Sequence, residues 1–265
     1  MFCITSDDKH LKLIKKIGYL PVRTGEGNHP PGFFTDNTNE NISFKNPSYG
    51  EYSFHYWIWK NYLKQLKNRW IGFCQYRRFW ALDQINEIND FNNFNEFILK
   101  SIPEKFEKFD VILGNPIYVN QFKLSKFVKK NFKVFIKNPS LFFNKQKRNL
   151  KFHFDMMHGH GNIDLAIKLL DKNDRENFKN FLDNSVSFNP NNMFICKSIE
   201  ILDNFYKSIF PWLERCESEF GFDKEGYGLK RIYGFLAERY MPYWFKKNFK
   251  TVNIPIIFKN LSDFN

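Results

Sequence analysis

Short apolar runs alternate along this chain with stretches in which apolar residues recur at intervals of three and four. The runs lie at residues 2–5, 70–74, 111–113 and 193–196, and each has the length of a strand rather than of a buried helix. The longest helical pattern follows the last run, at residues 199–216. Strands separated by helices predict an α/β structure, with a mostly parallel sheet flanked by helices and a helical C-terminal part.

The length of the chain, 265 residues, is enough for one large domain with a sizeable core. No stretch has the composition of a linker, so we predict a single domain over residues 1–265, with residues 1–120 and 121–265 as its halves. Within the first half, Ser48 and Glu51 have the spacing of a capping box. They predict a helix that begins at Ser48 and is buried on both sides.

Charge and cysteine usage narrow the class of protein. The formal net charge is +12, which favours nucleotide phosphates, anionic lipid surfaces or nucleic acid as partners without choosing among them. The four cysteines lie far apart and form no C-x-x-C pair, so no disulfide framework or zinc site is predicted and a reducing compartment is expected. Residues 1–10 do not resemble a secretory signal, and no run reaches the roughly 20 apolar residues of a membrane span.

Polar and cationic residues directly follow the apolar run at residues 70–74. They are Gln75, Tyr76, Arg77 and Arg78. Ligands of open α/β sheets bind beyond the carboxyl ends of strands, and guanidinium groups bind phosphate with two parallel hydrogen bonds. Adjacent residues of a strand point to opposite faces, so we expect one of the two arginines to contact a phosphate. The alternative is that both are surface charges at a strand end.

Several motifs carry a resemblance to a known family. They are Asp36-Asn37-Thr38-Asn39-Glu40-Asn41-Ile42-Ser43, Tyr56-Trp57-Ile58-Trp59-Lys60-Asn61, Ile71-Gly72-Phe73-Cys74-Gln75-Tyr76-Arg77-Arg78, Phe109-Asp110-Val111-Ile112-Leu113, Asn191-Asn192-Met193-Phe194-Ile195 and Gly234-Phe235-Leu236-Ala237-Glu238-Arg239. In this order the chain resembles a bacterial capsular polysaccharide synthesis family of GT-A-like glycosyltransferases, long treated as a domain of unknown function. Asn39 stands where that family usually has Gly, and Gln75 where it usually has His.

The resemblance implies a GT-A-like (Rossmann-like) fold and an enzyme that uses a nucleotide sugar. The expected reaction moves a hexosyl residue, galactose or galactofuranose, from a UDP-linked donor to a growing capsular or lipopolysaccharide glycan. Residues 1–120 would then bind the donor, and residues 121–265 would form the acceptor side. The expected location is the cytoplasm, including the cytoplasmic face of the inner membrane.

Donor-binding candidates come from the early polar loop and from the ends of the expected strands. The resemblance places the loop beside the donor, with Lys45 for a phosphate and Asp36 for a sugar hydroxyl. Asn and Asp also favour turns for their own sake, which is the competing interpretation for this loop. The donor-binding candidates are Arg23, Asp36, Asn37, Ser43, Lys45, Asn46, Gln75, Tyr76, Arg77, Arg78 and Asn192.

Glu238 is the predicted catalytic base. An inverting transfer needs a carboxylate that takes the proton of the acceptor hydroxyl as that oxygen attacks the sugar. The alternative is a structural salt bridge between Glu238 and Arg239 or Arg231. His158 and Asp164 are the other candidates for the base. They belong to a cluster with His153, Asp155 and His160 whose spacing matches no familiar metal motif, so structural or acceptor-binding roles are preferred for it.

No Asp-x-Asp motif follows the expected strands, although many GT-A enzymes use one to bind a metal. Arginine side chains can neutralise a leaving diphosphate directly. We therefore predict a site without a resident metal, and a divalent cation (Mn or Mg) remains compatible with it.

The sequence is also compatible with two further partners and with two other classes of protein. Lysines alternate with aromatic residues at residues 123–151 and 240–250, which would suit peripheral contact with an anionic membrane and a lipid-linked glycan acceptor. The same composition could serve a nucleic-acid-binding protein. The aromatic residues follow helical core spacing and no nucleic-acid-binding module is present, so nucleic acid is disfavoured. A non-catalytic scaffold of a polysaccharide assembly complex is the third hypothesis.

Overall fold

This computed structural model describes residues 1–67, 69–84, 87–88, 90–122, 136 and 138–264. Within them the larger sheet has nine strands. The strands of that sheet are β1 (Phe2–Thr5), β2 (Leu20–Arg23), β3 (Phe34–Thr35), β4 (Ile71–Gln75), β5 (Arg78–Trp80), β6 (Val111–Gly114), β9 (Phe194–Cys196), β10 (Thr251–Ile254) and β11 (Ile256–Phe258). A separate pair is formed by β7 (Ile117–Tyr118) and β8 (Ser187–Phe188).

The strands run in the order β10-β6-β9-β4-β1-β2-β3, with β5 and β11 as an antiparallel branch beside β4. The β3-β2-β1-β4 strands are parallel, and so are β10 and β6. Strand β9 lies between these two groups and is antiparallel to both of its neighbours. The predicted sheet, mostly parallel and flanked by helices, is confirmed, with β9 as the reversed strand.

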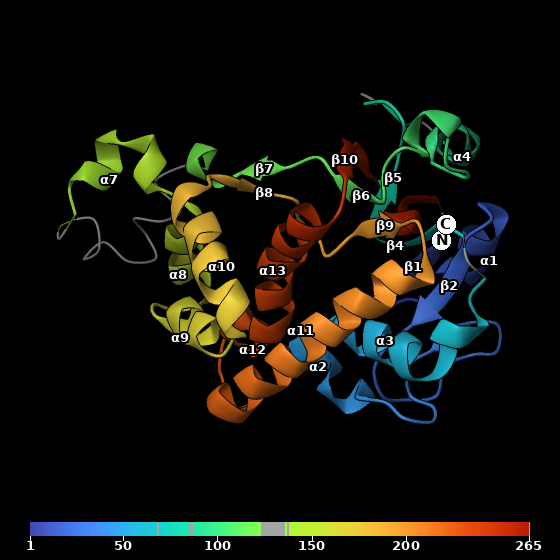
Figure 1. The fold of residues 1–265 in the computed structure, drawn as a ribbon. Coiled ribbons are helices and arrows are strands. Elements are labelled where there is room, and N and C mark those ends of the chain that lie inside the picture. Colours follow the sequence, from blue (N-terminus) through green and yellow to red (C-terminus); the bar gives the residue numbers. More distant parts are fainter. Residues whose placement is uncertain (68, 85–86, 89, 123–135, 137, 265) are drawn as a thin grey trace.

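Helices surround the sheet, and the longest ones lie in the C-terminal half (Figure 1). They are α1 (His10–Lys16), α2 (Asn46–Tyr49), α3 (Tyr52–Trp57), α4 (Phe91–Phe97), α7 (Ser140–Phe143), α8 (Leu150–His158), α9 (Asn162–Lys168), α10 (Lys172–Asn184), α11 (Ile199–Phe220), α12 (Tyr227–Lys230) and α13 (Ile232–Asn248). In Figure 1, α11 and α13 lie between the sheet and the group formed by α8, α9 and α10. The two chain ends lie close together, and His10 of α1 is hydrogen-bonded to Ser262 near the C-terminus.

Alternate residues of each central strand face opposite sides of the sheet, as the pleat requires. On one side Phe73 of β4 and Phe194 of β9 join the cluster formed with α3, α11 and α13. On the other side Cys74 and Ile195, their neighbours in sequence, join the cluster formed with α1, α4 and β5. Both faces of these strands are therefore buried, which explains why their sequences are continuous apolar runs.

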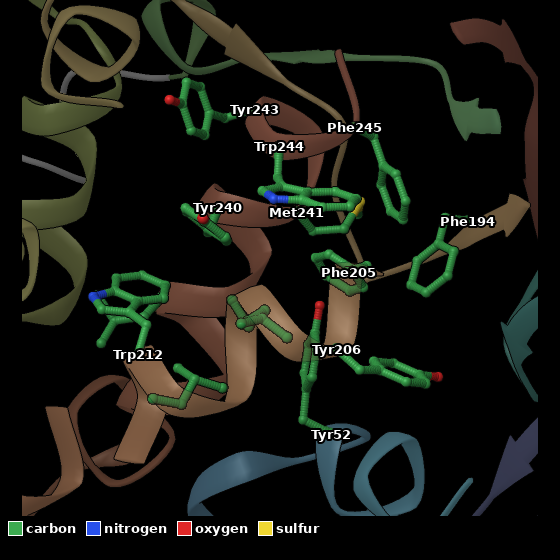
Figure 2. Packing of buried hydrophobic residues seen from close by; sticks show 14 of the residues in the cluster. Tyr52, Phe194, Phe205, Tyr206, Trp212, Tyr240, Met241, Tyr243, Trp244 and Phe245 are labelled. Atoms are coloured by element: carbon green, nitrogen blue, oxygen red, sulfur yellow. The ribbon is translucent and has the colours of Figure 1, made fainter. Parts of the chain in front are cut away.

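Aromatic side chains fill the layer between the sheet and its C-terminal helices (Figure 2). Phe205 of α11 packs with Phe194 of the sheet at a ring-centroid distance of 5.5 Å and with Phe245 of α13 at 4.7 Å. Trp212, about two turns further along α11, packs on Tyr240 at 4.8 Å. The high Phe content is thus used in the core that joins α11 and α13 to the sheet.

The predicted helix from Ser48 is wrong in its start and in its continuity. Ser48 lies inside α2 and is buried, and the chain then turns at Gly50, whose φ of 59° ends α2 before α3 begins. No side chain caps α3. Residues 58–62 continue it as a π-helical turn. The Glu51 side chain therefore does not cap a helix. Its carboxylate accepts hydrogen bonds from Gln75 and Asn192.

The structure also contains helices that the sequence did not predict. His153 and His158 lie in the helix α8, which is capped by Asn149, whose side chain accepts a hydrogen bond from the backbone N–H of Phe152. The polar helix α10 follows, with Phe178 and Leu182 buried. Part of the basic segment at residues 123–151 lies outside the described residues. Among the helices that are described, none combines the length and the apolar character that a bilayer span requires.

Candidate functional site

A cleft of about 340 Å³ opens at the edge of the sheet where β1 and β4 end; we call it the arginine cleft. The ends of β1 and β4 contribute Thr5 and Gln75. Because β9 is antiparallel to β4, the residues that precede β9, Asn191 and Asn192, reach the same edge. The rest of the lining comes from β1 and the residues that follow β1, β2 and β4, from α2 and the turn before α3, and from α12 and the first turns of α13. These further residues are Ile4, Ser6, Thr24, Asn46, Gly50, Glu51, Tyr76, Arg77, Arg78, Tyr227, Arg231, Gly234, Phe235 and Glu238.

Asn191 and Asn192 both have left-handed backbone conformations, with φ of 74° and 52°. Asn tolerates this conformation better than most residues, so this sequence can make the turn without glycine. The turn directs the backbone N–H of Asn191 to the Oε1 atom of Glu238, at 2.6 Å. The side chain of Asn192 donates to Oε1 of Glu51, at 2.9 Å, and to the carbonyl oxygen of Gly234. The turn thus holds both carboxylates of the cleft.

Gln75 links a carboxylate to an arginine. Its amide nitrogen donates to Oε1 of Glu51 at 3.3 Å and to the carbonyl oxygen of Asn191 at 3.1 Å. Its amide oxygen accepts a hydrogen bond from Nη1 of Arg78 at 2.7 Å. A side chain with a donor and an acceptor is needed for this arrangement, and an amide supplies both regardless of pH. Gln75 therefore positions Arg78 with respect to the carboxylates.

Three guanidinium groups line the cleft, on Arg77, Arg78 and Arg231. Arg77 is exposed and lies over the ring of Tyr76, 4.9 Å from its centroid. Arg231 approaches Glu51 to 3.6 Å. These groups bring three positive charges to the cleft, and a multiply charged anion such as a diphosphate would be attracted to them.

Two carboxylates, those of Glu51 and Glu238, line the same cleft. Their side chains are only 12% and 15% exposed. Burial raises the pKa of Glu51 above its ordinary value, Arg231 and the hydrogen bond from Asn192 oppose this, and the charge of Glu238 adds to it. Glu238 is held on its other oxygen, Oε2, by Arg239 at 2.7 Å. Arg239 is itself buried and lies 3.7 Å from the centroid of the Phe188 ring.

Several of the predicted site residues meet in this cleft. They are Asn46, Gln75, Tyr76, Arg77, Arg78, Asn192 and Glu238. Asn46 also bonds the carbonyl oxygen of Gly50 and the hydroxyl of Ser53, so its amide shapes the turn before α3. Both interpretations of Glu238 have a counterpart in the structure, because the residue faces the cleft and also pairs with Arg239.

Five other predicted donor-binding residues do not line the cleft. Arg23 pairs with Asp8 at 2.9 Å. Lys45 pairs with Glu217 on α11 at 2.7 Å, so its charge is already neutralised away from the cleft. Asp36, Asn37 and Ser43 bond within their own loop, to the backbone N–H of Gly25, to the carbonyl oxygen of Gly27 and to the side chain of Asn41 respectively.

Asp36 is fully buried, and burial raises its pKa. The predicted contacts of Asp36 with a sugar hydroxyl and of Lys45 with a phosphate have no support in this geometry.

The alternative bases also lie outside the arginine cleft. Asp164 pairs with Lys151 at 2.7 Å, and Lys151 also pairs with Asp155. His158 is buried, bonds the carbonyl oxygen of Gly228 and stacks on Phe235 at a centroid distance of 4.0 Å. Throughout the described ranges, no group of three or more His, Cys, Asp or Glu side chains is arranged to hold a metal ion.

Sequence reasoning missed Glu51, Arg231 and Asn191 as site residues. A signal existed for Glu51, which is the one acidic residue between Asn46 and Asp83 and stands among aromatic residues. The spacing of Ser48 and Glu51 instead favours a capping role for Glu51, because the sequence does not reveal the turn at Gly50. No comparable local signal marks Arg231 or the backbone of Asn191, since both act through contacts between distant segments.

Comparisons with known proteins agree with this architecture. An apo structure of WbbM, described as a bifunctional glycosyltransferase, superimposes with a TM-score of 0.61 at 18% sequence identity. The match covers 97% of this chain and 45% of WbbM, so the chain spans less than half the length of that protein. No curated protein matches the sequence. The model of a family described as a domain of unknown function (DUF4422) matches residues 3–249, and the chain therefore belongs to this family.

Proposed function

We propose that this protein is a glycosyltransferase that moves a hexosyl residue from a nucleotide sugar to a glycan. The observation that carries the proposal is the meeting of three arginines and two carboxylates in one cleft at the carboxyl edge of the sheet. That edge is where ligands of open α/β sheets bind. The fold shared with WbbM, a protein described as a glycosyltransferase, supports the same class of reaction.

The arginines would bind the diphosphate of the donor. As the bond between the sugar carbon and the phosphate oxygen breaks, both electrons leave with the nucleoside diphosphate, whose charge increases. Arg78 is held by Gln75, so it can meet that charge without first becoming ordered. Arg77 is exposed and can approach from the rim of the cleft. We propose a UDP-linked donor that carries galactose or galactofuranose, following the family resemblance.

Glu238 would accept the proton of the attacking hydroxyl. The acceptor oxygen forms the new bond to the sugar carbon, its proton passes to the carboxylate, and the diphosphate departs. The N–H of Asn191 fixes Oε1 of this carboxylate, and each carboxylate oxygen keeps a second lone pair for the acceptor hydroxyl. A capsular or lipopolysaccharide glycan at the cytoplasmic face of the inner membrane is the proposed acceptor.

The test is turnover of UDP-hexoses by Arg77→Ala, Arg78→Ala and Glu238→Ala variants, measured as UDP release with and without added glycan. Removing one preorganised charge-stabilising group should lower kcat by about 100-fold. Arg69→Ala is the matched control, because Arg69 is exposed and precedes β4, whereas Arg77 and Arg78 follow it. It should turn over as the unchanged protein does.

Undiminished turnover in all three variants would remove these assignments. Binding of UDP-hexoses without transfer or hydrolysis would favour the scaffold hypothesis. A parallel thermal-shift series with and without Mn²⁺ or Mg²⁺ would show whether a divalent cation takes part in donor binding.

A further inference from the structure

A second cavity, of about 640 Å³, adjoins the arginine cleft on the side of α8 and α12. Both cavities are lined by Asn191, Tyr227, Phe235 and Glu238. The carboxylate of Glu238 therefore stands at the boundary between the two spaces. A group bound in the second cavity could reach this carboxylate while the arginine cleft holds another ligand.

The second cavity differs from the arginine cleft in its charge. Of the described residues that line it, Arg239 is the single Lys or Arg side chain. The Arg239 side chain is 2% exposed and already contacts Glu238, His153 and the Phe188 ring, so its charge is not available to a ligand. A phosphate would lose its hydration here without gaining a free cation, and a neutral ligand is favoured.

The side chains that line the second cavity indicate which neutral ligand would bind. Phe188, Tyr227 and Phe235 present aromatic rings, and Met157 and Leu229 add apolar side chains. Tyr227 is 72% exposed and meets Phe235 edge to face at a centroid distance of 5.8 Å. Carboxylates, which accept hydrogen bonds from hydroxyl groups, line the same cavity through Glu225 and Glu238. A sugar ring has a C–H face for the aromatic rings and hydroxyl groups for the carboxylates.

We propose that this second cavity binds an uncharged sugar ring of the acceptor glycan, with one hydroxyl directed at Glu238. This proposal adds a second substrate site to the proposed function. It rests on that function, because only a glycosyltransferase would use the bound sugar as an acceptor. The ring packs against Tyr227 and Phe235, and the rest of the bound glycan extends into solvent past the exposed side of Tyr227. The phosphate-bearing donor and the neutral acceptor are thus sorted by the charges of two adjoining cavities.

Two neighbouring methionines of α8 provide a matched test. Met157 lines the second cavity, whereas Met156 lines a different one. Met157→Trp should fill the second cavity, and Met156→Trp adds the same bulk elsewhere. The probes are para-nitrophenyl glycosides of galactose, glucose, mannose and N-acetylglucosamine. Saturation-transfer NMR measures their binding to the protein in the presence of UDP. UDP affinity is measured in parallel by thermal shift.

We expect at least one glycoside to bind, Met157→Trp to weaken it about tenfold or more, and Met156→Trp to leave it unchanged. Because Tyr227 is exposed, Tyr227→Ala is a second variant that does not depend on core packing, with Tyr227→Phe as its control. Tyr227→Ala should weaken the glycoside and Tyr227→Phe should not.

Absence of binding by every glycoside, or binding that neither Met157→Trp nor Tyr227→Ala weakens, would overturn the assignment. Hydrolysis of UDP-hexoses by the unchanged protein tests the proposed function separately, since water then replaces the acceptor. If a glycoside binds and Met157→Trp weakens it, but no UDP-hexose is hydrolysed, the second cavity is supported as a sugar-binding site. The same result contradicts the proposal that the protein is a glycosyltransferase.

Discussion

Glu51 shows how a single buried carboxylate organises the arginine cleft. It accepts hydrogen bonds from Gln75 and Asn192, and Arg231 lies 3.6 Å away. These partners come from three segments that are distant in sequence. Its charge therefore fixes the relative positions of an arginine and two amides that face the proposed donor.

Glu51→Gln should lower kcat for donor turnover about tenfold, because hydrogen bonds to a charged acceptor are roughly twice as strong as neutral ones. The folded protein raises the pKa of Glu51, so it binds this proton more tightly than the unfolded chain does. Its contribution to stability must fall as pH rises from the ordinary value of 4.5 through the raised value, and it stays low above that.

Thermal unfolding of both proteins from pH 4 to pH 8 checks this sign. The melting temperature of Glu51→Gln relative to the unchanged protein should increase with pH over that window. A constant difference at all pH values would contradict the assigned pKa direction. Gln can still accept the hydrogen bond from Asn192, so loss of that bond does not confuse the comparison.

Arg239 is a buried cation whose partner faces the proposed reaction. Arg239→Ala should destabilise the fold by about 3 kcal/mol, because it leaves Glu238 without its ion pair and removes the contact with Phe188. Urea unfolding measures the change. Arg215→Ala is the control, since Arg215 is 39% exposed and pairs with the exposed Asp171, and it should cost under about 1 kcal/mol.

At the scale of secondary structure, the turn between α2 and α3 affects both the stability of the fold and the position of a residue of the site. Gly50 has a φ of 59°, and a Cβ atom added there would lie 2.5 Å from Nη2 of Arg231. Gly221, after α11, has a similar φ of 62° and no atom within 4 Å of such a Cβ. Both positions favour glycine because of their positive φ, but only at Gly50 would a Cβ atom also collide with Arg231. Comparing the two glycines therefore separates backbone strain from the contact with Arg231.

Gly50→Ala and Gly221→Ala should each lose roughly 1–2 kcal/mol of unfolding free energy from backbone strain. Only Gly50→Ala should also weaken binding of UDP, because Ala at that position displaces Arg231 from the cleft. Equal UDP affinity in the two variants would show that Arg231 does not contribute to the binding of this anion. Calorimetric titration with UDP distinguishes these outcomes.

The strands β1, β4, β6 and β9 and the helix α11 were predictable, because the four strands are apolar runs and one stripe of α11 is apolar in the sequence. The helices α8 and α10 were not, since α8 holds histidines and α10 is largely polar outside Phe178 and Leu182. Their burial depends on packing against distant helices. In the site, Arg77, Arg78 and Glu238 could be proposed from the sequence, but the Asn191–Asn192 turn that holds the carboxylates of Glu51 and Glu238 could not.

At the scale of the whole molecule, the two ends of the chain build adjacent parts of one structure. After Lys250 the chain adds β10 beside β6 and β11 beside β5, and Ser262 bonds His10 of α1. The last segment buries Ile254, Ile257 and Leu261. Full burial of such side chains stabilises a protein by roughly 1.5–3 kcal/mol each, which together approaches the entire stability of a domain.

A chain that ends after Lys250 should therefore fail to fold, as judged by loss of the cooperative thermal transition. Ser262→Ala, which removes only the hydrogen bond to His10, should cost about 1 kcal/mol and keep the transition. A truncated protein that melts cooperatively near the temperature of the full chain would show that the sheet edge formed by β10 and β11 is dispensable.

The contact between Asn191 and Glu238 is made by a main-chain amide, which every amino acid except proline supplies. Alanine scanning of this loop would leave that contact chemically intact. Alignments would also pass over it, because they record which side chains are retained and not which peptide groups are used. An experimenter who wishes to sever it must alter the peptide itself, for instance by exchanging the amide for an ester at position 191.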